Sequence, residues 1–240
     1  MRLIINADDF GLTESITDGI IDGIKAGVVT STTLMANTQA TEYAIAKAHE
    51  NKIDCIGFHA NFTLGRPLTR CPSVCDTGGN FLYIDKQIEN NNADEKEVYN
   101  EAKAQLNFIL DRGIKVSHID SHHWIRKHPV IHKAIVRLAR EHGFPVRNEC
   151  DLPSDIKTTD VYEPGFQFEE NVNVTKLREI LSKYRDTNKT VELSCHVGYM
   201  DEYSKGITSY RPREKELQVL LEAKRKGVFN GIEMVSFKDI

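Results

Sequence analysis

The amino-acid sequence predicts one α/β domain over residues 1–240, with a distorted TIM-barrel-like fold of about seven βα units and parallel strands. Short apolar segments that favour strands alternate with longer segments of helical periodicity along the whole chain. No sharp change of composition and no internal repeat divides it. A length of 240 residues is common for a single α/β barrel, and the number of units is smaller than in a complete barrel. We therefore expect an incomplete or distorted barrel.

The first half of the chain shows this alternation clearly. Strands are expected where apolar or β-branched residues cluster, and helices where isoleucines recur at helical spacing or alanines are frequent. The expected strands are 2–7, 30–35 and 55–62, and the expected helices are 13–26 and 40–50. Residues 65–92 contain several glycines and prolines and an asparagine run, so they predict a long irregular excursion that shapes a binding site or a lid.

The second half continues the pattern around a second excursion, the turn-rich segment 150–170. Amphipathic segments predict helices, and short apolar runs predict strands. The expected helices are 94–112, 128–141, 173–183 and 213–226, and the expected strands are 115–119, 144–147, 190–195 and 231–236. In folds of this kind the chemistry lies at the carboxyl ends of the strands, so polar residues there are candidates for a site.

Composition excludes several classes of function. A net charge of -4 without a long basic run argues against nucleic acid as a partner. The chain starts without the apolar stretch of a signal peptide, and no segment is long enough to span a bilayer, so we expect a cytoplasmic protein with no membrane partner. Its five scattered cysteines do not resemble a disulfide framework. Cys71 and Cys75 lack a second pair with which to complete a structural zinc site.

Polar residues collect where four of the expected strands end. The first cluster is the pair Asp8 and Asp9. Adjacent carboxylates point in different directions, so one could bind a metal while the other acts as a base, although helix capping is the alternative. The second is His59, which interrupts an apolar strand and could equally be a hydrogen-bonded core residue.

The third cluster spans residues 118–123 and contains three histidines and an aspartate, a density that is hard to explain by packing and that indicates metal binding. The fourth is His196, which is a weak signal alone. One aspartate and two histidines from separate strands would offer ligands that suit zinc or, with waters, Mg²⁺ or Mn²⁺. Three ligands leave room for water and substrate, and amide hydrolysis needs such a metal together with a base and an acid.

These residues make the chain similar to the YdjC-type carbohydrate deacetylases, which include chitooligosaccharide deacetylases, nearly from end to end. The specific motifs are Asn6-Ala7-Asp8-Asp9-Phe10-Gly11-Leu12 and His118-Ile119-Asp120-Ser121-His122, and the weaker ones are Gly27-Val28-Val29-Thr30-Ser31-Thr32-Thr33, Gly57-Phe58-His59 and Glu192-Leu193-Ser194-Cys195-His196. The resemblance implies a TIM-barrel-like deacetylase that uses a divalent ion, Mg²⁺ or Zn²⁺, and that often forms a homodimer. By position, it implies that Asp9, His59 and His122 bind the metal, that Asp8 is the general base, and that His196 is an acid or an oxyanion stabiliser.

The chain departs from the family pattern after His122. Further histidines usually follow there at alternate positions, where this chain has Trp124 and Arg126, which bears on the identity of the substrate. Trp124 could stack on a sugar ring or simply pack against the protein. Alternation along an extended segment would point His123 away from His122.

The predicted function is removal of the N-acetyl group from an acetylated carbohydrate such as a short chitooligosaccharide. We hypothesise further that the sugar carries a phosphate, with Arg66 and Arg211 as candidate substrate-binding residues beside Arg70 and Arg213 in or near expected loops; solvated surface arginines are the alternative. Two other functions stay open. One is a metal-dependent phosphoesterase, which would often bind two metals, and the other is a sugar-binding homologue without activity.

Overall fold

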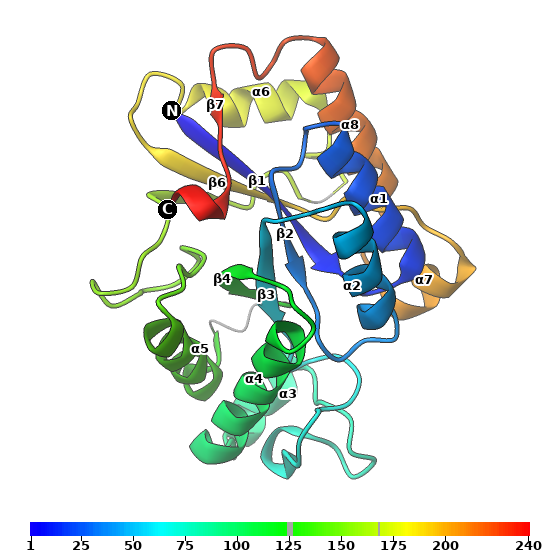
Figure 1. Cartoon of the computed structure of the whole chain (residues 1–240), viewed down its shortest axis with the longest axis vertical. Coiled ribbons are helices and arrows are strands. Elements are labelled where there is room, and N and C mark those ends of the chain that lie inside the picture. The colour runs from blue at the N-terminus through cyan, green and yellow to red at the C-terminus, as the bar shows by residue number, and fades with distance from the viewer. Residues whose placement is uncertain (124–126, 168) are drawn as a thin grey trace.

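A curled parallel sheet forms the centre of the fold in the computed structural model, which describes residues 1–123, 127–167 and 169–240 (Figure 1). Its strands are β1 (Arg2–Phe10), β2 (Ser31–Leu34), β3 (Ile56–Ala60), β4 (Val116–Ser121), β5 (Val161–Glu163), β6 (Thr190–Cys195) and β7 (Glu233–Met234). Their order across the sheet is β4-β3-β2-β1-β6-β5, and β7 also pairs with β1. All the pairings between these strands are parallel. The predicted distorted, TIM-barrel-like fold is therefore confirmed.

Helices follow the strands and cover the sheet. They are α1 (Glu14–Lys25), α2 (Thr41–Glu50), α3 (Ile84–Asn90), α4 (Glu95–Leu110), α5 (Pro129–His142), α6 (Val174–Ser182), α7 (Glu202–Ile207) and α8 (Arg213–Arg225). Thr13 caps α1 by accepting a hydrogen bond from the amide of Ile16 at 3.2 Å, and the helix then buries Ile16 and Ile20 against the sheet. In Figure 1, α1, α2 and α8 lie on one side of the sheet, and α4 and α5 pack together at the lower end. A helix able to cross a membrane is not found in the part of the chain that the structure describes.

Some segments differ from the sequence prediction. The expected strand 144–147 makes only one bridge, between Val146 and Ile119 of β4, because Pro145 has no amide hydrogen to donate and the chain bends away after Arg147. The turn-rich segment 150–170 contains β5, which pairs with β6. The short helices α3 and α7 were not expected, since neither is long enough to show a helical period in the sequence.

The excursion between β3 and α4 is fixed to the barrel by buried polar side chains. Glu101 of α4 is fully buried and accepts hydrogen bonds from the amides of Leu68, at 3.0 Å, and Thr69, at 2.7 Å. Gln105 of the same helix donates to the carbonyl oxygen of Asn61 at 2.7 Å. Buried polar groups that find partners in this way hold loop backbone that no sheet supports. The excursion is consequently more regular than its glycines and prolines predict.

The two ends of the sheet have different roles. At the amino ends of the strands, Phe237 is buried in the C-terminal turn and stacks on His118 with ring centroids 3.7 Å apart. At the carboxyl ends, β1, β3 and β4 lead directly into the polar clusters that the sequence singles out. The polar clusters therefore lie at the carboxyl end, as the architecture predicts.

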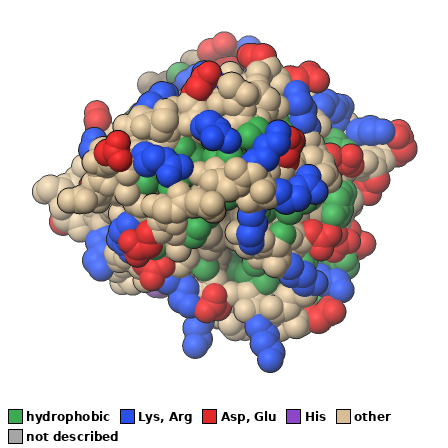
Figure 2. Space-filling model, turned by 90° about the horizontal axis from the view of Figure 1, so that it is seen from above, with side chains coloured by type: hydrophobic (Ala, Val, Ile, Leu, Met, Phe, Trp, Pro, Cys, Tyr) green, Lys and Arg blue, Asp and Glu red, His purple; other side chains and the backbone are tan. Residues whose placement is uncertain are grey.

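Figure 2 shows basic and acidic side chains mixed over the face that lies at the top of Figure 1.

Candidate metal centre and active site

The backbone at the end of β1 directs two adjacent carboxylates to different partners. Asp9 has a φ of 72°, in the left-handed region, and the register between β1 and β2 shifts between Ala7 and Phe10. A residue other than glycine in this conformation costs on the order of 1–2 kcal/mol and is found mostly where the surroundings enforce it. Asp8 consequently contacts Arg147, whereas Asp9 contacts His122 and Arg213.

Asp9, His59 and His122 form a buried trio at the carboxyl ends of β1, β3 and β4. Oδ1 of Asp9 lies 2.9 Å from Nδ1 of His122 and 3.3 Å from Nε2 of His59. One ligand atom from each residue lies within 4.8 Å of the others. The three residues are at most 8% exposed. A carboxylate oxygen and two imidazole nitrogens in this arrangement can hold a divalent cation.

Outer contacts fix the orientation of the imidazole of His59. Its Nδ1 lies 2.7 Å from Oδ1 of Asp120, and the hydroxyl of Thr33 donates to the other oxygen of Asp120 at 3.1 Å. Burial alone would lower the pKa of His59, but Asp120 and Asp9 raise it to about 10, so the surrounding carboxylates favour a positive charge at this place. A histidine that binds metal usually has its second nitrogen held by a carboxylate in this way, so the residues fit a bound cation.

The second oxygen of Asp9 contacts Arg213, which is fully buried at the start of α8. Oδ2 of Asp9 lies 2.6 Å from Nη2 of Arg213. Burial alone would raise the pKa of Asp9, but Arg213 and His122 hold it well below its ordinary value. Asp9 is thus a carboxylate with one oxygen paired to a guanidinium and the other directed toward the two imidazoles.

Arg147 connects three buried carboxylates behind the site. Its guanidinium forks onto Asp8 at 2.7 and 2.8 Å, and it also lies 2.8 Å from Asp120 and 2.7 Å from Glu192. Asp8, His59 and Asp120 form a second group with metal-ligand geometry, but Arg147 already supplies the positive charge there. Asp8 also accepts a hydrogen bond from Asn6 at 2.9 Å, which further restricts its orientation.

His196 approaches the site from the end of β6. Its Nε2 lies 4.0 Å from Oδ2 of Asp8. Burial lowers the pKa of His196 to about 4, so the neutral imidazole predominates near neutral pH. Its backbone amide donates to the fully buried carboxylate of Glu216, which also accepts from the hydroxyl of Tyr210. Burial raises the pKa of Glu216 to about 7.

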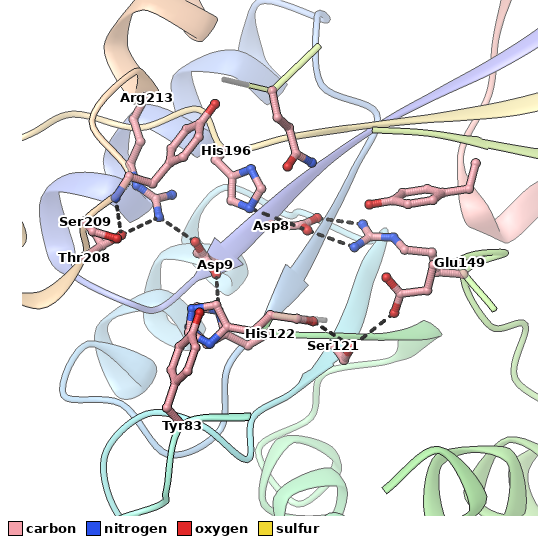
Figure 3. Close-up of a pocket in the computed structure, with 15 residues that line it drawn as sticks. Asp8, Asp9, Tyr83, Ser121, His122, Glu149, His196, Thr208, Ser209 and Arg213 are labelled. Atoms are coloured by element: carbon pink, nitrogen blue, oxygen red, sulfur yellow. Dashed lines mark hydrogen bonds and ion pairs between the residues drawn. The ribbon is translucent and has the colours of Figure 1, made fainter. Parts of the chain in front are cut away.

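These side chains line a pocket of about 200 Å³. Figure 3 shows Asp8 close to His196 in the pocket, and Asp9 between Arg213 and His122. The lining residues are Asp8, Asp9, Tyr83, Ser121, His122, His123, Arg147, Glu149, Tyr162, Gln167, His196, Thr208, Ser209, Tyr210 and Arg213. Most of them can donate or accept hydrogen bonds, as a site for a hydroxyl-rich ligand requires.

Several residues that the sequence singles out lie elsewhere. Arg66 and Arg70 line a separate surface pocket with Cys71 and Cys75. Arg211 donates to the backbone carbonyls of Thr208 and Lys205 and does not line the site, whereas its neighbour Arg213 does. Trp124 and Arg126 lie outside the residues that the structure describes.

The expectation that His123 points away from His122 is wrong. The two rings lie 3.9 Å apart and both line the pocket. Strand alternation does not apply, because β4 ends at Ser121 and His123 has a φ of 58°. The Nδ1 of His123 is paired with the hydroxyl of Thr63 at 2.7 Å.

Sequence reasoning assigned no role to Arg147, Glu192 or Glu216. Each is almost fully buried, and each is a charged residue within or directly beside an apolar segment. Such a position is a usable signal, because a charge is rarely buried unless it is paired or functional. The sequence could not indicate which charges pair, since Arg147 and Glu192 lie 45 positions apart.

Known proteins resemble this chain over nearly its whole length. The YdjC-like protein family matches residues 2–230. A carbohydrate deacetylase of Clostridium beijerinckii is 37% identical over the full length of both chains, and one of Vibrio parahaemolyticus is 36% identical over 92% of this chain and 88% of its own.

Solved structures extend the comparison to the fold. A protein of Enterococcus faecalis proposed to cleave cellobiose phosphate has a TM-score of 0.90 at 28% identity, covering 99% of this chain and 98% of its own. A family 4 acetyl xylan esterase of Clostridium thermocellum, solved with a cobalt ion, shares the fold alone, with a TM-score of 0.51 at 10% identity over 100% of this chain and 89% of its own. From the family match and the full-length relatives, this chain belongs to the YdjC-like protein family.

Proposed function

We propose that this protein removes the acetyl group from an N-acetylated sugar, with a divalent cation held by Asp9, His59 and His122. The observation that carries the proposal is the three-ligand set at the base of the pocket, with Asp8 beside it. Three protein ligands leave coordination positions for substrate and water. The carbohydrate deacetylases of about 36% identity over nearly the full chain support the same reaction.

The donor set favours zinc or another transition-metal ion. Two imidazole nitrogens and one carboxylate oxygen suit these ions, whereas Mg²⁺ prefers oxygen ligands and retains several waters. When bound, the cation supplies Lewis acidity that polarises the acetyl carbonyl and makes water more acidic. Asp120 supports this role of the trio, because it keeps the Nε2 of His59 directed at Asp9.

Asp8 is the candidate general base. In hydrolysis the water oxygen bonds to the acetyl carbon, the carbon–nitrogen bond breaks, and the water gives up one proton. Arg147 and Asn6 restrain Asp8, so its carboxylate can accept this proton without first reorienting. The adjacent Asp9 is committed to the metal trio and to Arg213.

His196 is the candidate for the second proton-handling role. Its Nε2 lies 4.0 Å from Asp8, a separation that one bridging water could span, so His196 could pass the proton from Asp8 to the leaving nitrogen. Because the neutral imidazole predominates, His196 can alternatively donate an N–H hydrogen bond to the carbonyl oxygen as negative charge develops there. Both roles require the contact between the amide of His196 and Glu216, which holds the residue at the pocket.

The preferred substrate in this proposal is a short, uncharged oligosaccharide of N-acetylglucosamine. Arg66, Arg70 and Arg211 do not line the pocket, and Arg213 is paired with Asp9, so the support for phosphate recognition is weak. A two-metal phosphoesterase is disfavoured because Arg147 supplies the charge that a second cation would bring.

The test is acetate release from N,N'-diacetylchitobiose by zinc-loaded protein, beside an Asp8→Asn variant. Asp155→Asn is the matched control, since Asp155 is exposed, pairs with Arg140 and lies outside the pocket. We expect release by the parent and by the control, a loss of at least about a hundredfold in the variant, and one zinc ion per chain. Sugar binding without acetate release would indicate an inactive homologue, and two ions per chain would favour phosphoester hydrolysis. A 6-phosphorylated disaccharide assayed in parallel tests the phosphate hypothesis.

A further inference from the structure

We propose that the ring of Tyr83 is the surface on which a second sugar unit of the substrate stacks. This unit is the neighbour of the one whose acetyl group is removed. The proposal rests on the proposed function and assigns a specificity-determining residue to it. Tyr83 comes from the excursion between β3 and α4, which contributes no metal ligand. Figure 3 shows Tyr83 reaching from this excursion toward His122.

A series of aromatic rings connects the metal trio to the mouth of the pocket. The rings of His59 and His122 lie 5.6 Å apart, those of His122 and His123 lie 3.9 Å apart, and those of His123 and Tyr83 lie 5.2 Å apart. Exposure rises along the series, from 1% for His59 to 53% for Tyr83. Tyr83 is therefore at the rim, two ring contacts away from His122, and a group that reacts beside His122 leaves the next sugar unit near this ring.

The described residues around Tyr83 hold its backbone and contact one part of its ring, and they leave the residue 53% exposed. Directly before Tyr83, the carbonyl oxygen of Leu82 accepts a hydrogen bond from Gln87 at 2.6 Å. The same amide group of Gln87 also donates to the carbonyl oxygen of Phe62 at 2.6 Å. It thereby connects the start of the excursion to the backbone next to Tyr83. His123, which meets the ring of Tyr83 edge to face, is itself held by Thr63. Little ordering is therefore left to occur when a ligand binds.

The chemistry of the exposed ring points to a sugar. A tyrosine ring offers a flat apolar face, and a pyranose presents C–H groups on one face and hydroxyls around its edge. The exposed Tyr199 and Tyr203 engage their hydroxyls with Asp22 and Gln39, but the hydroxyl of Tyr83 has no protein partner among the described residues. Tyr83, unlike those two tyrosines, lines the pocket, so the face of its ring is available to a ligand there.

The experiment compares substrate length with and without the ring. Tyr83→Ala should raise the KM for N,N'-diacetylchitobiose by about tenfold and leave its kcat nearly unchanged, because the ring contacts a unit remote from the reacting carbonyl. The same variant should change turnover of N-acetylglucosamine by less than about twofold. Tyr83→Phe should retain the parent KM, since the face of the ring makes the contact. Tyr203→Ala, an exposed tyrosine outside the pocket, is the matched control.

Equal effects on both sugars would overturn the assignment to a second unit, and an unchanged KM in Tyr83→Ala would overturn the stacking surface altogether. A binding measurement separates this proposal from the proposed function. Calorimetric titration of N,N'-diacetylchitobiose into zinc-loaded Asp8→Asn protein needs no turnover, and adding Tyr83→Ala should weaken binding by about tenfold. If the parent releases no acetate but this difference persists, the deacetylase function fails and the stacking surface stands. If acetate is released and the difference is absent, the stacking surface fails alone.

Discussion

Replacing Arg147 tests whether one buried guanidinium holds the proposed general base, Asp8, and the outer contacts of the candidate metal site together. We consider two substitutions, Arg147→Lys, which keeps the charge but cannot fork, and Arg147→Met, which removes the charge. Arg147 is 1% exposed, and Asp8, Asp120 and Glu192 all lie within 2.8 Å of it. Both variants should fold less stably and lose activity through misorientation of Asp8.

The structure sets the expected magnitude. Removing one partner of a buried ion pair costs about 3–5 kcal/mol, and three carboxylates share this guanidinium, so Arg147→Met should reach at least the upper end of that range. Lysine restores the charge but only part of the hydrogen bonding, so we expect a loss of about 2–3 kcal/mol for Arg147→Lys. Domains have a total stability of about 5–15 kcal/mol, so the Lys variant should stay folded and is the informative one.

The deficit should also depend on pH. In the wild type, burial alone would raise the pKa of Asp120, but Arg147 and His59 hold it at about 2. Burial already raises the pKa of Glu192 to about 8 in spite of Arg147. When lysine or methionine replaces Arg147, the pKa of Asp120 in the folded chain rises, whereas Glu192 already takes up a proton when the wild type folds below about pH 8. Folding of the variant therefore takes up a proton at Asp120 that folding of the wild type does not, so the deficit of the variant shrinks as the pH falls.

Urea unfolding in the presence of a chelator measures this deficit on the metal-free protein. Arg137→Lys is the control, because Arg137 is exposed and pairs, among the described residues, with Glu141 and the Tyr99 ring. Its effect should stay below about 0.5 kcal/mol at every pH. A deficit of less than about 1 kcal/mol at pH 8 for Arg147→Lys, or one that stays constant with pH, would refute the reasoning.

Three further predictions concern the candidate metal site, Glu216 behind the pocket, and Phe237 at the amino ends of the strands. Asp120→Asn should weaken zinc binding by about 10–100-fold in a calorimetric titration, because Asp120 orients His59; an unchanged affinity would exclude this role. Burial raises the pKa of Glu216 to about 7, so wild-type stability should fall as the pH rises from about 5 to 8, and urea unfolding of Glu216→Gln should show a flatter dependence. Phe237→Ala should cost about 3–5 kcal/mol in the same assay, against little for the exposed Leu68→Ala, because Phe237 is 1% exposed and stacks on His118.

Much of the fold could be predicted from the sequence because its long elements carry their own periodicity. The expected helices 13–26 and 40–50 nearly coincide with α1 and α2, and the expected strand 190–195 coincides with β6. The elements that escaped are short. β5 has three residues, and α7 has six and is stabilised by a capping box at Asp201, so neither produces a repeating pattern.

The candidate site divides in the same way. The sequence could predict that an aspartate and two histidines meet at one place, because such residues at strand ends are unusual for packing and the parallel topology brings those ends together. It could not predict the partners of Arg147 or Glu216, since these partners lie on other elements and buried charge pairs leave no periodic signal. The expectation for His123 was wrong because it relied on strand alternation two residues beyond the end of β4.

The adjacent carboxylates of Asp8 and Asp9 show how backbone conformation assigns chemical roles. In a regular strand the two side chains would point to opposite faces of the sheet, and only one of them could reach a site on a single face. The φ of 72° at Asp9 breaks this alternation, and both residues line the same pocket. Each carboxylate then meets a separate buried guanidinium, Arg147 for Asp8 and Arg213 for Asp9. Because those two cations lie apart, the carboxylates do not compete for one position, so one is available to a metal while the other is available to a proton.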